Sequence, residues 1–599
     1  MDIQPAHKPR PPGSELTPQA LLAAVIVAAI MGASYPYMVL KLGFGPNVSI
    51  VAAFFGFVIL SLISRKTYDR WQNNIVQTAG TSAAQTSFMC ILLATFEMLR
   101  ASKVVHFTIN PTPAQTFIWL SVSSLLGVLL AVPMRRHFIV DEKLPFPDGM
   151  AAGETLMVLD PPRNLGKGDP EFDQARRAAL VLVGGLIASG LLMFFRDDSK
   201  LIPVIPEGWD PGVLTLGAAG ASFVVATMGV GLSYNLLSIG GGMLISFRVN
   251  FWMLVGGMLG WIVAPMLLIG GGILPDHATR TQVLYWIMWP GIGIIMSGGL
   301  TMLALRWRLL VQAFSAMGEA SISGEEFPLS LVIGGVAVLT VALCLIQWLF
   351  FGMPIWMTMV SVVMAIPLML VGLRALGETN WGPIGTLQNL TQGLFAAFSP
   401  GNAVAITLGG GTTGTVAVTS EGLIQDYKAG YIIGSTPRVM TIAQLIGAPI
   451  GAAALAVTYP ALVKAYGIVG DHAGLSAPGS RRTAGFVELL STGVDKLPQS
   501  AMWAMLISVV LGVLFAVLES RPGLKRWTPS PTGLSLGALL PFSAVSTIFV
   551  GGALAEIWKR RSPTIAGIYL VPLASGLIAG EAMVAVIAPL LLALGVGHR

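Results

Sequence analysis

Charged side chains are scarce in this sequence of 599 residues. Lys and Arg number 35 and Asp and Glu 29, or 11% of the chain, whereas a soluble globular protein carries about 25%. Apolar residues make up 54%. This composition excludes a soluble protein of one or several domains. Dividing the apolar residues by the roughly 20 that one crossing needs gives on the order of 16 spans, so the sequence predicts a polytopic membrane protein.

Several chemical signatures are also absent. The two cysteines, Cys90 and Cys344, both lie in apolar runs, which excludes a disulfide framework. The six histidines never pair at metal-ligand spacing, so neither a metal site nor another cofactor is expected. The glycine-rich stretch 409–415 lacks the lysine of a phosphate-binding loop, which argues against ATP hydrolysis. Basic residues are spread over many short loops, so nucleic acid is not an expected partner.

Glycine and proline are abundant instead, at 70 and 38 residues. Transmembrane helices tolerate both, because neighbouring helices satisfy the freed backbone groups. We therefore expect an all-α membrane protein of about 14–16 transmembrane helices, some broken or re-entrant. The apolar runs lie near 16–40, 45–64, 75–99, 113–134, 177–195, 212–232, 251–273, 283–305, 329–351, 354–376, 400–421, 437–459, 499–519, 534–557, 564–580 and 581–597. The Gly/Thr-rich run 400–421 is the candidate for a re-entrant segment, and a break at Gly580–Glu581 separates the last two runs.

The organisation along the chain follows from these runs. We expect a disordered cytoplasmic tail (1–15), an N-terminal transmembrane half (16–305), a cytoplasmic connector (306–328) and a C-terminal transmembrane half (329–599). A faint similarity between 73–84 and 402–413 hints that the halves are related. If the N-terminus is inside, the inside loops hold about two thirds of the Lys and Arg, which predicts that both termini are cytoplasmic.

Acids inside apolar runs are the first functional candidates, because a charge at the bilayer centre costs about 2.5 to 3.5 kcal/mol on insertion scales. Glu97, Glu421, Glu556 and Glu581 qualify. The alternative for each is an acid at the headgroup level or one paired with a loop arginine. Glu97 and Glu421 are the candidates for proton coupling.

A polar helix face is the second candidate. With a period of 3.6, Asn74, Gln77, Thr78, Thr81 and Gln85 share one face that is too polar for lipid. We expect this face to line a cavity, because amides suit a polar, peptide-like solute. Interhelical hydrogen bonding is the alternative. The residues assigned to the substrate path are Asn73, Asn74, Gln77, Thr78, Gln85, Thr412 and Thr413.

Two loop motifs complete the candidates. Pro145, Phe146 and Pro147 precede Asp148 and a run of small residues, a pattern that suits either a helix break with its N-terminus open to an anion or a rigid, capped loop. Further along the chain, Asp426 together with Lys428 or Arg438 would form a gate ion pair, unless these are solvated loop charges.

Taken together, these motifs resemble those of the oligopeptide transporter (OPT) family, in particular its prokaryotic and yellow-stripe-like branch. The resemblance rests on ordered motifs across nearly the whole chain: Leu16-Thr17-Pro18, 73–78, 144–147, Gly377-Glu378-Thr379, 426–431 and 434–438. It implies a proton-coupled secondary transporter of small peptides, glutathione-like thiol peptides or metal chelates of amino-acid-derived ligands. It also implies a place in the inner (plasma) membrane of a bacterium, and a homodimer is plausible.

The sequence departs from the family pattern at a few motif positions: Gln72, Asp148, Tyr427 and Ala429. Substrate choice can therefore differ from that of better-known relatives. The leading hypothesis is a proton-coupled importer, not an enzyme. A membrane-embedded enzyme acting on a lipid or polyprenyl substrate is one alternative, although Asp-x-x-Asp and His-Glu-x-x-His spacings are missing. A passive channel is the other.

Overall fold

The computed structural model describes most of the chain: residues 15–42, 48–63, 69–159, 170–196, 204–211, 215–218, 221–224, 228–275, 278–305, 326–379, 382, 384–470, 473–492, 499–521 and 523–593. Within these residues, eleven helices are long and apolar enough to cross a membrane. The prediction of a polytopic, all-helical membrane protein is confirmed. Most of the expected tail (1–14) and of the expected connector (306–325) lies outside the described residues.

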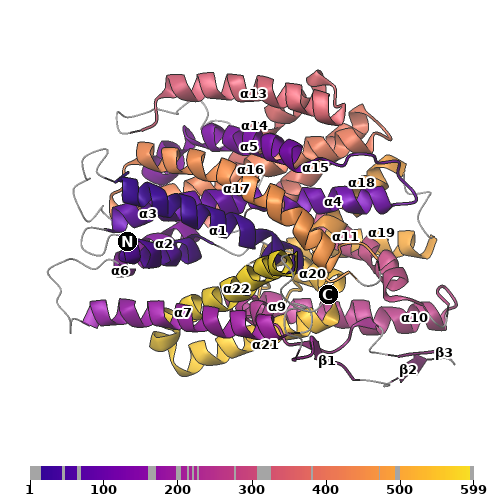
Figure 1. Ribbon diagram of the computed structural model, residues 1–599. Helices are drawn as coiled ribbons and strands as arrows, with labels where there is room; N and C mark the ends of the chain where they lie inside the picture. Colours follow the sequence, from indigo (N-terminus) through magenta and orange to yellow (C-terminus); the bar gives the residue numbers. More distant parts are fainter. Residues whose placement is uncertain are drawn as a thin grey trace.

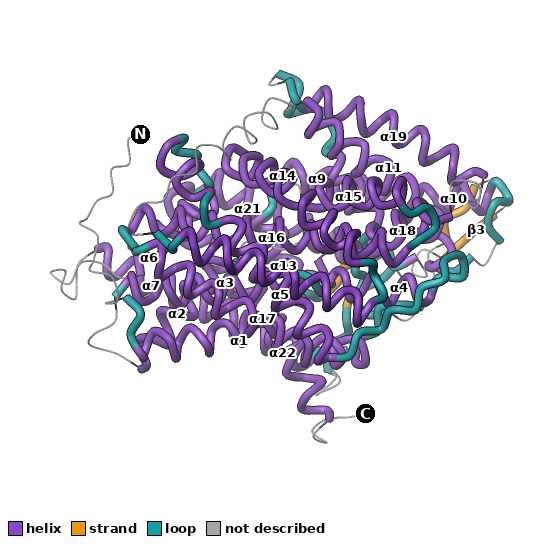
Figure 2. The backbone as a smooth tube through the Cα atoms, turned by 90° about the horizontal axis from the view of Figure 1, so that it is seen from above, coloured by secondary structure: helices purple, strands orange, loops and turns teal. Residues whose placement is uncertain are grey.

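The long helices run roughly along one direction, horizontal in Figure 1, and form two bundles. Figure 2 shows the same arrangement from above. The first bundle contains α1 (Pro18–Leu42), α2 (Ser49–Ile63), α3 (Arg70–Ser87), α4 (Cys90–Ala101), α5 (Pro113–Ala131), η1 (Arg136–Asp141), α6 (Pro147–Leu159), α13 (Leu329–Phe351), α14 (Ile355–Thr379), α15 (Ile384–Phe398), α16 (Ala403–Ile433), α17 (Pro437–Tyr466) and α18 (Pro478–Thr492).

The second bundle contains the remaining helices: α7 (Pro170–Phe195), α8 (Leu236–Leu244), α9 (Phe247–Met258), η4 (Leu259–Val263), α10 (Ala264–Gly270), α11 (Arg280–Leu305), α19 (Gln499–Glu519), α20 (Pro531–Leu539), α21 (Phe542–Arg561) and α22 (Pro563–Ala593). Both halves of the sequence contribute to both bundles, and α22 also packs against α1.

Helices from the two halves pair in a crossed pattern. In the second bundle, α7 packs along α22 and α11 along α19, while α8 contacts α21 and α20 contacts α9. If α7 is exchanged with α19, α8 with α20, α9 with α21 and α11 with α22, each of these pairs becomes another pair of the same set. In the first bundle, α3 packs on α17 and α16 on α5 in the same way. The faint sequence similarity between 73–84 and 402–413 therefore falls at equivalent places in the two halves.

Two helix breaks in the second bundle have the same local structure. The nine-residue helix α8 ends at the extended Ile245 before α9 begins, and the nine-residue α20 ends at the extended Leu540 before α21. Glycines let the partners approach: a Cβ at Gly256 would meet the carbonyl of Leu534, and one at Gly537 would meet that of Met253. These glycines allow the backbones of α9 and α20 to approach each other closely where the two helices cross, as small residues do at helix contacts in membranes.

A pair of glycines also allows α17 to pack closely against α3. Gly447 and Gly451 are four residues apart on α17, and a Cβ on either would meet the backbone of Ala79 or Ala83 on α3. Ser82 then reaches α17 and donates from its Oγ to the Gln444 carbonyl over 2.8 Å. The close approach allows the polar face of α3 to form direct bonds with its neighbours.

Several expected spans differ from the structure. The described parts of 212–232 are not helical over the length of a span: β2 (Thr215–Ala218) pairs antiparallel with β3 (Ala221–Val224), and β4 (Leu232–Ser233) pairs antiparallel with β1 (Gly208–Trp209). The break expected at Gly580–Glu581 is also wrong, because α22 continues through both residues. The run 75–99 contains a break at Phe88–Met89, between α3 and α4. Residues 400–421 form part of the 31-residue helix α16.

Ion pairs gather at one end of the first bundle. Arg135 contacts Glu326 over 2.8 Å, and Arg374 contacts Glu142 over 2.7 Å. Burial raises the pKa of Glu326, which lies before the first residue of α13, while Arg135 opposes this shift in part. The first pair ties the end of the expected connector to the region around η1, and the second ties α14 to the same region.

Candidate functional site

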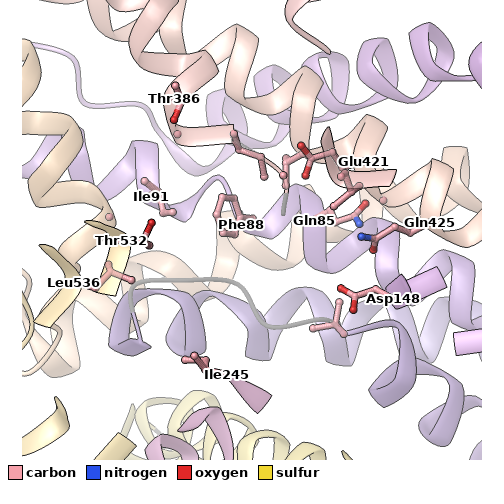
Figure 3. Close-up of a pocket in the computed structure, with 18 of the residues that line it drawn as sticks. Gln85, Phe88, Ile91, Asp148, Ile245, Thr386, Glu421, Gln425, Thr532 and Leu536 are labelled. Carbon is pink, nitrogen blue, oxygen red and sulfur yellow. The ribbon is translucent and has the colours of Figure 1, made fainter. Parts of the chain in front are cut away.

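A cavity of about 380 Å³ lies between the two bundles. Its walls come from α3, α6, α15, α16 and α18 on one side and from α9, α11 and α20 on the other. Figure 3 shows Gln85, Glu421, Gln425 and Asp148 close together on one wall. The apolar Leu536 lies at the other end of the view. The cavity wall therefore combines polar side chains with apolar residues such as Ile91, Ile245 and Leu536, and the hydroxyl groups of Thr386 and Thr532 lie toward the end where Leu536 lies.

Glu421 is the acid at the centre of the polar wall. It lies midway along α16 and its carboxylate packs against Gly382, where a side chain would collide with it. Its exposed fraction is 8%, and Oε1 has no hydrogen-bond partner within the described residues. A carboxylate held this way in a membrane protein lacks a compensating partner, so a proton or a solute group would stabilise it.

Gln85 faces the same wall from α3. It lies so close to α16 that a Cβ at Gly422 would overlap its side-chain amide, and its Oε1 has no partner among the described residues. Glycine at 422 therefore makes room for an amide in the cavity. Gln425, one turn beyond Glu421, adds a second amide. Ser49, Thr81, Thr386 and Thr532 contribute hydroxyl groups.

Arg482 brings a positive charge to the cavity. It comes from α18 and packs against Gly385 at the start of α15. No ion pair or hydrogen bond of Arg482 occurs within the described part of the chain, and its Nε is buried without a partner. The cavity thus contains an arginine and a glutamate that do not pair with each other.

A buried polar cluster lies behind the cavity, where α3 meets α16 and α17. Asp426 is fully buried and accepts hydrogen bonds from Nε2 of Gln77 and Nε2 of Gln444, each over 2.6 Å. Asn74 donates to the Ser435 hydroxyl over 3.0 Å. These amides join helices rather than line the cavity, which is the alternative stated for the polar face of α3. Thr81 and Gln85 do line the cavity.

The gate ion pair expected at Asp426 is not formed. The Lys428 ammonium donates to the Leu144 carbonyl over 2.9 Å, and Arg438 is exposed. Lys428 thereby connects α16 to the loop before α6 instead of to a carboxylate. The physical reason is that two glutamine amides already occupy both carboxylate oxygens of Asp426.

The Pro-Phe-Pro loop (145–147) positions α6 against α16. Phe146 has a positive φ of 41°, is fully buried and donates its N–H to the Gly377 carbonyl over 3.1 Å. Pro145 is exposed, and Pro147 is the first residue of α6. Gly149 then lets α6 approach the Gln425 carbonyl closely. This path places Asp148, in the first turn of α6, on the cavity wall.

The remaining candidates lie elsewhere. Thr412 bonds to Gln347 and Thr413 to Thr391, so both join neighbouring helices. Asn73 and Thr78 are fully buried and do not line the cavity. Glu97 forms an ion pair with Arg100, one turn away on α4, and lines a separate pocket with Asn110 and Lys464.

Glu581 is paired inside the second bundle. Its Oε1 accepts from Nη2 of Arg196 over 2.9 Å, and its Oε2 accepts from the Leu237 N–H at the start of α8 over 3.1 Å. Arg196 also donates to the Tyr234 carbonyl. This satisfied pair explains why α22 continues through an acid that the sequence marked as a break.

Arg482 and Gln425 were missed at the sequence level. The expected spans leave 460–498 between them, whereas this segment contains α18, which reaches the cavity. The Pro, Gly, Ser and Thr residues in 478–485 are typical of a loop, so local sequence did not indicate this helix.

Comparison with known proteins adds independent findings. The family model described as OPT oligopeptide transporter protein matches residues 15–592. A putative oligopeptide transporter from Saccharomyces cerevisiae is 24% identical, over 81% of this chain and 81% of its own length. A probable metal-nicotianamine transporter from Oryza sativa is 22% identical, with 94% and 89% covered. A metal-nicotianamine transporter from Arabidopsis thaliana is also 22% identical, with 96% and 93% covered.

Proposed function

Because the chain belongs to the OPT oligopeptide transporter family, we propose that it is a proton-coupled importer of small peptides or of metal chelates of peptide-like ligands. The observation that carries this proposal is the cavity between the bundles, with the unpartnered carboxylate of Glu421 in its polar wall. The names of the yeast and plant relatives agree with these two solute classes.

The lining chemistry supports a peptide-like solute. Peptide groups present both N–H donors and carbonyl acceptors, and the amides of Gln85 and Gln425 offer the complementary groups. The apolar residues of the cavity wall accommodate side chains or the carbon skeleton of a chelator. A volume of about 380 Å³ lies within the usual range of small-molecule sites.

Glu421 is the proposed proton-binding residue. Protonation of Glu421 removes a buried charge and supplies a hydrogen-bond donor. The protonated and ionised side chains therefore interact differently with the cavity and its solute. One proton moving down about 100 mV releases about 2.3 kcal/mol, which sustains roughly 50-fold accumulation of a neutral solute. Glu97 is less suited, because Arg100 already neutralises it outside the cavity.

The crossed helix pairs support alternating access. We propose that 16–305 and 329–599 are related halves whose relative movement opens the cavity to either side. The cavity lies where the two bundles meet, so movement between the bundles would change its walls. The broken helices α8/α9 and α20/α21 contribute Ile245 and Leu536 to these walls.

Uptake into proteoliposomes tests the coupling. Purified full-length protein is reconstituted, and radiolabelled trialanine, glutathione and a ferrous nicotianamine chelate are offered with and without an inward pH gradient. We expect the gradient to drive accumulation above equilibrium in the wild type. Glu421→Gln should retain exchange of solute at equal pH but lose gradient-driven accumulation.

Glu97→Gln is the matched control, because it also removes one acid from a membrane helix and should keep coupling. Equal gradient-driven uptake by wild type and Glu421→Gln would disprove the role of Glu421. Uptake that never exceeds equilibrium would indicate a channel.

A further inference from the structure

Arg482 carries a positive charge that nothing in the described part of the protein neutralises. Its Nε is buried without a hydrogen-bond partner, and neither Glu421 nor Asp148 forms an ion pair with it. Arginine stays protonated in proteins, so it cannot escape the cost of burial by losing a proton. A partly buried cation beside a cavity is stabilised by an anion that the solute can supply.

The neighbouring Arg481 on the same helix differs from Arg482, because its Nε has a hydrogen-bond partner. Its Nε donates to the Ser476 carbonyl over 2.9 Å, in the turn before α18. Arg481 does not line the cavity, whereas Arg482 does. Adjacent residues of one helix point in different directions, so only the second of the pair faces the solute space.

Two nearby glycines make room for the two charged groups of the cavity. Gly385 leaves room for the Arg482 guanidinium, and Gly382 leaves room for the Glu421 carboxylate. The two glycines are three residues apart, so their Cα atoms are separated by at most about 11 Å. A short peptide or an amino-acid-derived chelator has groups of opposite charge at comparable separations. The cavity therefore offers a distinct cationic subsite as well as an acidic one.

We propose that Arg482 binds a carboxylate of the transported solute. A guanidinium and a carboxylate match as two parallel N–H···O hydrogen bonds, which gives both affinity and orientation. The substrate class is thereby narrowed to solutes with a free carboxylate, namely peptides with an unblocked C-terminus or chelators with an exposed carboxylate. This inference rests on the proposed function, because it takes the cavity as the solute site.

Binding of matched solute pairs to the purified full-length protein tests the proposal. The probes are trialanine with its C-terminal amide, and glutathione with its dimethyl ester, titrated by calorimetry in detergent. We expect the wild type to bind each free acid at least about tenfold more tightly than its blocked partner. Arg482→Gln should reduce this preference to within about twofold, and Arg482→Lys should keep part of it.

Arg481→Gln is the control, and we expect it to keep the full preference. Gly385→Ala is a second route to the same effect, since its Cβ would push the guanidinium aside without removing the charge. It should lower the preference even if Arg482→Gln proves too unstable to purify.

The outcomes separate the two proposals. If the wild type binds acid and blocked forms equally, or if Arg482→Gln or, where that variant cannot be purified, Gly385→Ala retains the full preference, Arg482 is not a carboxylate site and the transport function is untouched. If the wild type binds no member of either pair, the proposed peptide-like substrate class fails and the carboxylate subsite fails with it.

Discussion

Nε2 of Gln77 donates a 2.6 Å hydrogen bond to Oδ1 of Asp426 and so joins α3 to α16 across 349 residues of sequence. Gln444 of α17 donates to the other carboxylate oxygen over the same distance. One buried carboxylate therefore holds three helices of the first bundle together. Both glutamines meet at this carboxylate, and their own side-chain oxygens have no hydrogen-bond partner within the described residues.

Replacing Asp426 by leucine should destabilise the first bundle. The change keeps the branching of the side chain but enlarges it, and it leaves two buried glutamine amides without an acceptor, at a cost of about 1–3 kcal/mol each. We expect the unfolding temperature of the detergent-solubilised protein to fall by several degrees. Asp426→Asn keeps one acceptor oxygen and should lose less. Equal stability of the leucine variant and the wild type would contradict the proposed role of the cluster.

Gly422→Ala should impair transport more than folding. Its Cβ would overlap the Gln85 amide, which can move into the cavity at the expense of the polar wall. Solute binding, measured by calorimetry, should weaken at least about tenfold, while the unfolding temperature changes little. Gly334→Ala is the matched control, because a Cβ there on α13 meets nothing within 4 Å and alanine favours helix by about 1 kcal/mol. Normal binding by Gly422→Ala would show that Gln85 has no part in the site.

Removing the carboxylate of Glu581 should be among the most damaging single changes. Glu581→Ala leaves the buried Arg196 charge without its partner, and breaking such a pair costs about 3–5 kcal/mol. We expect little folded protein on size-exclusion chromatography. Glu556→Gln removes an acid from a more exposed pair with Arg560, for which about 1 kcal/mol or less is expected. Similar yields of the two variants would count against this distinction.

Alanine at Gly256 or Gly537 should destabilise the crossing of the broken helices to a similar extent. At each position a Cβ would meet a backbone carbonyl, of Leu534 or of Met253, that cannot rotate away. Overpacking of this kind costs about 1–3 kcal/mol. Thermal unfolding measures the loss, with Gly567→Ala of α22 as the control, since its Cβ meets nothing within 4 Å. A large effect at only one position would mean that the two sides of the contact between α9 and α20 are not equivalent.

The local sequence pattern predicted helices well in segments whose residue composition alone indicates which parts are buried. The polar face of α3 was identified from its 3.6-residue period, and that face is buried. Which part of it reaches a cavity was beyond the pattern. The division between Gln77, bonded to Asp426, and Gln85, in the cavity wall, depends on where α16 crosses α3.

The failures have a common cause in partners that are distant in the chain. The break expected at Glu581 assumed an unpaired acid, and Arg196, which neutralises it, lies 385 residues away. The apolar run at 212–232 satisfied the length of a span, yet two short antiparallel strand pairs satisfy part of its backbone instead. Hydropathy indicates whether a segment can lie in a membrane. It does not identify the residues that will form hydrogen bonds with that segment.

The crossed pairing of α7 with α22 has a consequence for biosynthesis. A ribosome finishes α7 at residue 195 but does not begin α22 until residue 563. Until then the face of α7 that receives α22, including Ser189, which donates to the Leu577 carbonyl, is left facing lipid. The second bundle therefore cannot close during synthesis of the first half, and a chain truncated before α22 would leave α7 exposed to membrane quality control.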